Sequence, residues 1–535
     1  MYNMEIFIFI FFYKERVLMA IIDIALVCIY FIVILAIGIF AGRKDKNTRD
    51  FFLADRKIPW VAVVLSIVAT EISAATFLAV PGTGFNENLN YIQFGLGSIA
   101  ARFFIAWLFL TEFYKHDCTT VYEYLAKRFN ENTRYTGAVF FFVTRILGCG
   151  ARLMIAAVGL HVVTGWSLEL TLILFSLIAI IYTTFGGIKA IVWTDVVQAL
   201  IFIAGGFIAL GFIWYKLPDG ACQAMTVAQQ GFWNPNISLS ASTFGFLDGF
   251  RIAEKANHLE LFHWFPKPVE GQASWITWLS DPNIFFLAFF NSLITTWAAL
   301  GTDQDMTQRM LTCKDIKSSQ RSLIVSGFVG IPVAIVFLFI GVSIYSYFQT
   351  YPDPLIVSNV PGVAEHDKIF AYFIRTALPG RLRTILIIGL IAAAMSSLDS
   401  TLGALTSSAI VDIYKPLIKK DASDKHYLFI SRCHIIGFGI ILGLIAWLLS
   451  EQRDFLWLCL SLTSITYGSL LGIFLLGVLT KRGTAKGNLF AMISGAILNA
   501  ILLYLIRTTN FPLGWSWLIL IGTAWTFCVG SLFKE

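Results

Sequence analysis

Small polar side chains recur along one apolar segment, residues 389–414, which reads GLIAAAMSSLDSTLGALTSSAIVDIY. Ala393, Ser396, Ser397 and Ser400 are spaced at i, i+3, i+4 and i+7, so they share one face of a helix. Hydroxyl groups on such a face either donate to the carbonyl one turn earlier or coordinate a hard cation. Small residues in this pattern also mediate close helix packing, so the spacing leaves all three uses open.

A second apolar segment, SIVATEISAATFLAVPGTGF at residues 66–85, carries Glu71, Ser73 and Thr76 near its middle. Its β-branched and small polar residues predict an unwound turn near residues 69–73. Irregular backbone at membrane depth is found only where it lines a cavity or is buried in protein. Its free carbonyl oxygens are good ligands for a cation such as Na⁺. The alternative is an ordinary helix with one buried glutamate.

Six ionisable residues lie within apolar segments, where charge is costly and functional residues concentrate. They are Glu71, Arg102, Arg145, Arg152, Asp195 and Asp399. Arg145 and Arg152 are seven residues apart and hence on one helix face. Arg102 is closer to a segment end and could snorkel to the interface. For every residue of this set, a structural salt bridge is the alternative to a functional role.

Composition indicates that lipid surrounds the segments that carry these residues. The chain has 535 residues, of which 57% are hydrophobic and 13% charged, with a mean hydropathy of +0.74. Soluble domains carry about 25% charged residues, so this chain requires a bilayer. The net charge of +6 is small and its basic residues form short clusters between apolar runs, which argues against nucleic-acid binding. The eight cysteines show no disulfide or metal spacing.

A membrane-spanning helix needs about 20 apolar residues, and this criterion predicts thirteen spans. They are expected at about 21–41, 59–80, 92–112, 135–163, 168–185, 190–215, 283–301, 322–348, 382–411, 429–450, 455–479, 487–506 and 512–532. With this count the basic loops fall on one side of the membrane, which the positive-inside rule makes cytoplasmic. The N-terminus is then outside and the C-terminus inside. The first 18 residues hold an apolar run too short to span, which makes Met19 a plausible start.

Four motifs resemble those of the sodium:solute symporter family, in the family's order. They are FFLADRKIPWVAVVLSIVATEIS at 51–73, YTTFGGIKAIVWTDVVQ at 182–198, GTDQDMTQRML at 301–311 and AAAMSSLDS at 392–400. The resemblance extends from about residue 20 to 530. It implies an all-α membrane protein with a leucine-transporter-type core of two inverted five-helix repeats and about 13 transmembrane helices.

The implied organisation has six parts. They are an N-terminal extension (1–18), an extra N-terminal span (19–45), inverted repeat 1 (51–215), an external loop (216–282), inverted repeat 2 (283–480) and two C-terminal spans (481–535). An amphipathic helix is expected at 366–378, beside Arg375, Arg381 and Arg383, which depart mildly from the charge pattern.

The resemblance implies a core sodium site and, in some members, a second one. The core site would use carbonyls of Ala69, Ile72 and Ala393 with the hydroxyls of Ser396 and Ser397. The second would use Asp195, Asp399, Ser396 and Ser400. Sialic-acid-type members have serine at position 399. The aspartate here could strengthen a cation site, bind a proton or pair with an arginine, so one or two sodium ions per cycle remain open.

The same resemblance suggests solute-binding residues. They are Glu71, Ser73, Thr76, Gln93, Arg152, Asp303 and Gln304. Sugar-type members have an amide at the position of Glu71. Sialic-acid-type members place an arginine within about one turn of Arg152, where it would bind a carboxylate. Asp303 and Gln304 either face the solute or form an inner gate with Arg309.

We therefore expect a sodium-coupled secondary active symporter, which imports a small organic solute by alternating access. The expected solute is a carboxylate such as sialic acid, or a sugar or polyol, with a cationic or amino-acid solute as the remaining alternative. Na⁺ is the expected coupling ion, the plasma (inner) membrane the location, and a monomer embedded in lipid the functional unit. The scattered histidines and cysteines predict no enzyme and no catalytic residue. A proton-coupled symporter with Asp195 or Asp399 as carrier, and a membrane sensor with a separate partner, are the alternatives.

Overall fold

The computed structural model describes residues 21–42, 47–230, 259–265, 276–278, 281, 283–353, 368–451, 453–509, 511, 513–514 and 517–534. These residues form helices and no strand, apart from one isolated bridge between Ile58 and Cys313. The expected all-α class is therefore confirmed. The N-terminal extension and Met19, and most of the external loop, lie outside the described residues.

The helices of the first half precede the external loop. They are α2 (Ile21–Ala41), α3 (Thr48–Leu53), η1 (Ala54–Arg56), α4 (Trp60–Glu71), α5 (Ala74–Asn86), α6 (Ile92–Phe104), η2 (Ile105–Phe109), α7 (Leu110–Lys115), α8 (Val121–Arg128), α9 (Glu131–Thr164), α10 (Leu168–Lys216) and α11 (Gly220–Gln230).

The second half follows the loop. Its helices are α14 (Phe285–Gly301), α15 (Gln304–Leu311), α16 (Ile316–Thr350), α18 (Ile369–Thr376), α19 (Gly380–Ser408), η3 (Ala409–Ile418), α20 (Asp424–Glu451), α21 (Arg453–Leu479), α22 (Ala485–Thr508) and α23 (Trp517–Leu532). The short helix α18 falls at the expected amphipathic segment.

Eight helices in the described residues are long and apolar enough to cross a membrane, or up to ten if each of two bent pairs is one span. The expected segments overlap helical stretches of the described residues, but 59–80 is divided between α4 and α5, and 92–112 between α6, η2 and α7. Segments 168–185 and 190–215 are not separate helices but the two arms of α10, joined at Gly187 (φ 51°, ψ −150°). Only glycine adopts that backbone conformation readily, so the chain bends there without a loop.

The predicted unwinding of the second segment is confirmed. Helix α4 ends at Glu71 and α5 begins at Ala74, and the two are inclined by 64°. A second pair, α14 and α15, is bent by 63° around Thr302 and Asp303. The Asp303 carboxylate caps α15 by accepting from the Asp305 N–H at 2.9 Å.

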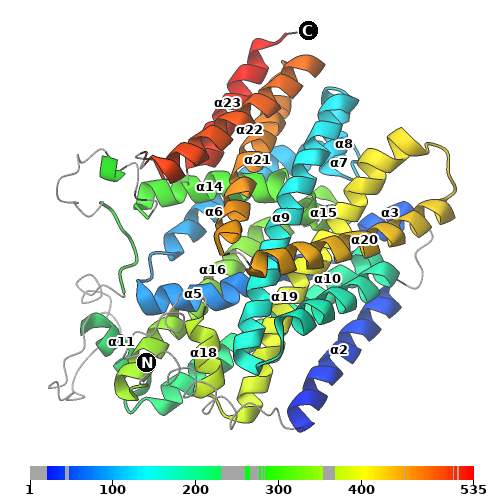
Figure 1. Cartoon of the computed structure of the whole chain (residues 1–535). Helices are drawn as coiled ribbons and strands as arrows, with labels where there is room; N and C mark the ends of the chain where they lie inside the picture. Colours follow the sequence, from blue (N-terminus) through cyan, green and yellow to red (C-terminus); the bar gives the residue numbers. More distant parts are fainter. Residues whose placement is uncertain are drawn as a thin grey trace.

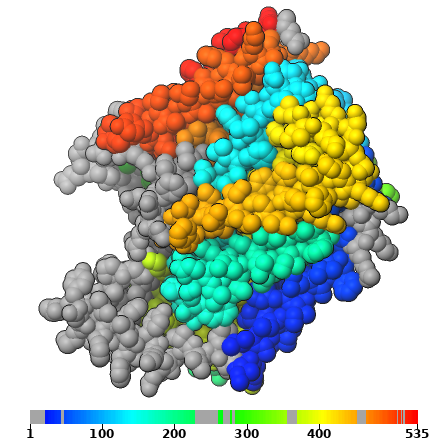
Figure 2. Space-filling view, turned by 45° about the vertical axis from the view of Figure 1, so that its right-hand side comes forward, coloured from blue at the N-terminus to red at the C-terminus, as the bar shows by residue number. Residues whose placement is uncertain are grey.

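The central helices pack around these breaks. Helix α10 lies along α19 and α2, α14 lies along α6, and α16 along α5, while α21, α22 and α23 form a group at one side (Figure 1). In Figure 2, α20, α10 and α2 form three parallel bands on one face. Their exposed side chains include Phe40, Phe207 and Leu448. Such a large apolar surface is stable in lipid and not in water, as in a multi-pass membrane protein.

Candidate functional site

The end of α4 touches α19 through the residues of the predicted core sodium site. The Ser396 hydroxyl reaches the Ala69 carbonyl at 2.9 Å and the Ala393 carbonyl at 3.1 Å. Ser397 Oγ lies 3.5 Å from the Ala393 carbonyl. Ile72 is the first residue beyond α4 and is buried. The structure thus brings together Ala69, Ala393, Ser396 and Ser397, with Ile72 at the adjoining break.

Carbonyl and hydroxyl oxygens are good ligands for a hard monovalent cation. An unwound turn leaves backbone carbonyls without a helical N–H partner, so these carbonyls can coordinate such an ion. The described residues contain no group of three or more histidine, cysteine or acidic side chains that could hold a metal ion. The oxygens at this contact are backbone carbonyls and serine hydroxyls, the kinds of ligand that an alkali cation accepts. The role of each oxygen as a ligand stays a prediction.

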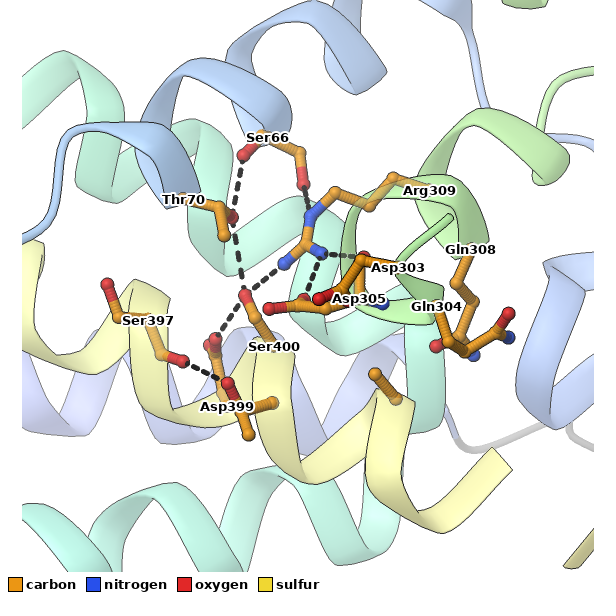
Figure 3. A network of polar contacts seen from close by, with 12 residues as sticks. Ser66, Thr70, Asp303, Gln304, Asp305, Gln308, Arg309, Ser397, Asp399 and Ser400 are labelled. Atoms are coloured by element: carbon orange, nitrogen blue, oxygen red, sulfur yellow. Dashed lines mark hydrogen bonds and ion pairs between the residues drawn. The ribbon is translucent and has the colours of Figure 1, made fainter. Parts of the chain in front are cut away.

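A buried network lies on the adjoining side of α19 (Figure 3). Asp195 Oδ2 accepts from the Ser66 hydroxyl at 2.5 Å and from Arg309 Nη2 at 3.3 Å. Arg309 Nη2 also donates to Ser400 Oγ, and Arg309 Nη1 donates to Asp305 Oδ1 at 2.8 Å. The Arg309 guanidinium therefore occupies the space between two residues of the predicted second cation site.

Asp399, the third residue of that site, faces α10. Its Oδ2 accepts from the Tyr182 hydroxyl at 2.5 Å and its Oδ1 from the Ser400 hydroxyl at 3.2 Å. Asp399 forms no ion pair within the described part of the chain, since Arg309 binds Asp195 and Asp305 instead. Of the three suggested uses of Asp399, pairing with an arginine is thus not observed.

Asp303 and Gln304 are fully buried at the α14–α15 break. Asp303 Oδ2 accepts from Arg145 Nε at 2.7 Å and from the Tyr467 hydroxyl at 2.9 Å. Gln304 donates to Ser407 Oγ at 3.1 Å and accepts from the Val121 N–H at 3.0 Å. Both side chains join helices to one another. Neither contacts the Arg309 side chain, so the predicted gate with Arg309 is not formed in this structure.

Asp305 is a site residue that sequence reasoning missed. It binds two arginines, accepting from Arg309 and lying 3.1 Å from Arg145 Nη1. The sequence Asp303-Gln304-Asp305 could have pointed to it, because it places two carboxylates at the start of one helix.

A cavity of about 230 Å³ opens at the α4–α5 break, between α6, α14 and α16. Its polar lining residues are Glu71, Thr76, Tyr91, Ser98, Arg102, Ser292 and Thr296. Glu71 Oε1 accepts from Arg102 Nη2 at 2.5 Å. The Arg102 side chain is only 3% exposed, so the suggestion that it snorkels is wrong. A larger hollow of about 580 Å³ between α3, α8, α9 and η3 contains none of the predicted site residues.

The predicted solute residues divide into groups. Glu71 and Thr76 line the cavity, and Ser73 is buried at the start of α5 beside it. Gln93 is fully buried and its amide donates to the Asn283 carbonyl at 2.5 Å and accepts from the His263 N–H at 3.4 Å. Gln93 therefore anchors the loop before α14 and does not line the cavity.

Arg152 differs from the other arginines in the apolar segments. Arg102, Arg145 and Arg309 each pair with a carboxylate of the chain. Arg152 is half-buried in α9, about two turns beyond Arg145, and forms no hydrogen bond or ion pair with a residue that the structure describes. Arg152 attracts the Asp305 carboxylate without bonding to it, and it does not line the cavity at the α4–α5 break.

Helices broken beside buried polar groups at mid-membrane are typical of secondary transporters. The chain belongs to the sodium:solute symporter family, whose model matches residues 51–495. The predicted sodium-coupled symport of a small solute, with Na⁺ as coupling ion, is confirmed with this membership. The relatives are transporters, which also confirms that the chain is not an enzyme.

Similar proteins cover most of the chain. The sodium/sialic acid symporter SiaT of Proteus mirabilis is 26% identical over 88% of this chain and 86% of its own. The sodium/glucose cotransporter of Vibrio parahaemolyticus is 26% identical over 88% of this chain and 83% of its own. The substrate-bound, outward-open structure of a Na⁺-coupled sialic acid symporter matches with a TM-score of 0.79 at 25% identity, covering 96% of this chain and 97% of that one. Mhp1, a nucleobase-cation-symport-1 family transporter, shares the fold with a TM-score of 0.50 at 12% identity over 90% of this chain and 92% of that one.

Proposed function

We propose that this symporter imports a carboxylate-bearing solute, such as sialic acid or a related sugar acid, together with Na⁺. The basis of this proposal is the Arg152 guanidinium in α9, which forms no hydrogen bond or ion pair with a residue that the structure describes. A charge within the membrane is costly without a partner. A solute carboxylate would supply that partner in the two-pronged geometry that arginine favours. The likeness to sialic acid symporters supports the same solute class.

A neutral sugar or polyol is the second candidate. The cavity at the α4–α5 break presents hydroxyl groups and a Glu71–Arg102 pair whose charges cancel. Such a lining suits hydroxyl groups without requiring a net charge on the solute. The likeness to a sodium/glucose cotransporter favours this reading. In both cases Glu71, Ser73 and Thr76 would hold the polar body of the solute, and only the acid would need Arg152.

Sodium would bind where the α4–α5 break meets α19, at the oxygens of Ala69, Ile72, Ala393, Ser396 and Ser397. The contact between Ser396 and Ala69 supports this position. An ion there would tie the broken helix to α19 and favour the outward-open state that accepts solute. This coupling is a population shift that depends on different ion affinities in the two states. The membrane potential would add about 2.3 kcal/mol per charge per 100 mV.

A second cation would bind near Asp195, Asp399 and Ser400. Arg309 Nη2 contacts both Asp195 and Ser400. A second Na⁺ would therefore enter only after the guanidinium moves, whereas a proton on Asp399 would need no such movement.

The architecture that we propose has thirteen transmembrane helices, with the N-terminus outside and the C-terminus inside the plasma membrane. Inverted repeats at 51–215 and 283–480 would follow the first span (19–45), and two spans (481–535) would follow the repeats. The similar bends of α4–α5 and α14–α15, one in each repeat, support this division. The functional unit would be a monomer in lipid.

Substitution of Arg152 tests the solute class. Arg152→Gln should lower sodium-driven uptake of sialic acid in proteoliposomes by at least 100-fold, because it removes the only partner of the carboxylate. That factor corresponds to about 2.7 kcal/mol, within the range for a charge-assisted hydrogen bond. If a neutral sugar is also carried, its uptake should change less than threefold.

The same preparation supplies the controls. Arg152 has no hydrogen-bonded or ion-paired partner among the described residues, so the variant should keep the elution profile of the parent protein and a melting temperature close to it. Undiminished sialic acid uptake, or equal loss of acid and neutral solutes, would refute the role of Arg152.

A further inference from the structure

β-Branched and small polar residues weaken the helix at the α4–α5 break, but they do not fix the 64° angle that the two helices adopt. The residues at the break include no proline, Ser73 makes no side-chain cap at the start of α5, and the Ile72 N–H still bonds to the Val68 carbonyl of α4. A helix that ends without a local stop signal must be held by contacts with other helices. The contact nearest to the break is made by Glu71, the last residue of α4.

Arg102 of α6 bonds both to Glu71 of α4 and to residues of α16. Arg102 Nη2 donates to Glu71 at 2.5 Å, and Nη1 donates to Ser326 Oγ at 2.7 Å and to the Leu323 carbonyl at 3.3 Å. One guanidinium therefore joins three helices at the depth of the break.

The Arg102 side chain crosses α16 at Gly327, which has no side chain to block it. A Cβ atom at Gly327 would lie 2.6 Å from Cδ and 2.7 Å from Nε of Arg102, closer than real Cβ contacts allow. Gly327 thus provides the groove through which the arginine passes, and Ser326 and Leu323 hold it there. Gly327, the Ser326 hydroxyl and the Leu323 carbonyl together form a binding site for the Arg102 side chain.

Stability alone does not account for this arrangement. The Arg102 side chain is 3% exposed, and its Nε–H has no hydrogen-bond partner in the described residues. A buried ion pair with an unmet donor is about neutral for folding compared with apolar residues. The Arg102–Glu71 ion pair therefore acts mainly by fixing the position of Glu71 and of the peptide that follows it.

We infer that Arg102 is a positioning residue for sodium. Its ion pair with Glu71, seated over Gly327, holds the break so that the carbonyls of Ala69 and Ile72 face Ser396 and Ser397. The pair thereby sets the affinity for Na⁺ without touching the ion. The inference rests on the core sodium site proposed above, and it makes α6 and α16 part of the coupling.

The test measures sodium affinity with and without solute. In proteoliposomes, Arg102→Gln and Gly327→Ala should each raise the Na⁺ concentration for half-maximal uptake about tenfold, which corresponds to about 1.4 kcal/mol. Because both residues also line the cavity proposed for the solute, Na⁺ binding by the purified protein without solute is the deciding measurement, and it should weaken by the same factor. Arg102→Lys, which keeps the charge, should recover part of the sodium affinity.

A double-variant cycle separates the ion pair from general damage. Glu71→Gln should raise the half-maximal Na⁺ concentration as Arg102→Gln does, and the double variant should be no worse than the worse single one, because both remove one interaction. Two control variants should leave the half-maximal Na⁺ concentration unchanged. Gly437→Ala adds a methyl group in open space on α20, and Lys115→Gln removes an exposed Lys115–Glu112 pair.

The outcomes distinguish this inference from the proposed sodium site. Sodium-independent uptake by the parent protein, or normal sodium activation of Ser397→Ala, would refute the site itself. If the parent and Ser397→Ala behave as expected but Arg102→Gln and Gly327→Ala keep the parent affinity for Na⁺, the positioning role is wrong. Unchanged Na⁺ binding by these variants in the absence of solute would also refute it. If Arg102→Gln does not fold, Gly327→Ala and Glu71→Gln decide the question.

Discussion

Replacing Ser397 by alanine should raise the Na⁺ concentration for half-maximal uptake about thirtyfold while the protein remains folded. The proposed cage has five oxygens, and the substitution removes one hydroxyl that would bind a charge, at a cost of about 2 kcal/mol. Ser397 is better suited than Ser396, because Ser396 Oγ reaches the Ala69 carbonyl at 2.9 Å whereas Ser397 Oγ lies 3.5 Å from its nearest acceptor. Sodium activation of uptake measures the effect.

Thr406→Val is the matched control for this variant. Thr406 lies on the same helix, is fully buried, and its hydroxyl has no hydrogen-bond partner in the described residues. Its replacement should leave sodium activation unchanged. A Ser397→Ala protein whose sodium activation lies within twofold of the parent would remove Ser397 from the cage.

Arg145→Gln should destabilise the protein by about 3–5 kcal/mol, the cost of leaving a buried carboxylate without its counter-ion. Arg145 Nε binds Asp303 at 2.7 Å, and Arg145 Nη1 lies 3.1 Å from Asp305. Both aspartates are at most 1% exposed, so water cannot replace the guanidinium. Thermal unfolding in detergent, followed by fluorescence, should show a clearly lower midpoint.

Adding Asp303→Asn to Arg145→Gln should restore part of the lost stability, because removing both charges costs less than removing one. Arg309 remains to balance Asp305. Arg321→Gln is the control, since Arg321 is exposed near the start of α16 and stacks on Trp60 with no carboxylate partner in the described residues. An Arg145→Gln protein as stable as the parent would show that this ion pair is not required for folding.

The break in α4–α5 and the serine face of α19 could be predicted from the sequence because each depends on local features. β-Branched and polar residues weaken a helix within a few positions, and helical periodicity places Ser396 and Ser397 on one face. The contact of Ser396 with Ala69 is where those two local features meet. The break and the serine face were therefore within reach of sequence reasoning, whereas their assignment to sodium came from the family resemblance.

The ion-pair partners could not be predicted in the same way. Glu71 pairs with Arg102, 31 residues away, and Arg145 pairs with Asp303, 158 residues away. Such pairs depend on how each helix is rotated about its axis, and hydropathy does not determine that rotation when helices are apolar on most sides. For this reason the sequence alone leaves both snorkelling and a salt bridge open for Arg102.

The solute residues were harder to predict than the sodium residues for the same reason. Gln93 and Gln304 are polar residues in apolar surroundings, as a solute ligand would be, yet the structure uses them to anchor loops and helices. A residue type indicates that a buried polar group needs a partner. It does not indicate whether that partner belongs to the chain or to a solute.

Uptake driven by an imposed sodium gradient would show whether this protein couples Na⁺ entry to solute import. Purified protein in proteoliposomes would be given sialic acid or glucose, with either an inward Na⁺ gradient at constant pH or an inward proton gradient without Na⁺. We predict accumulation of at least one of these solutes above its external concentration only with the Na⁺ gradient, and its loss when an ionophore dissipates that gradient. Accumulation that is driven by the proton gradient and does not depend on Na⁺ would contradict sodium coupling of solute import.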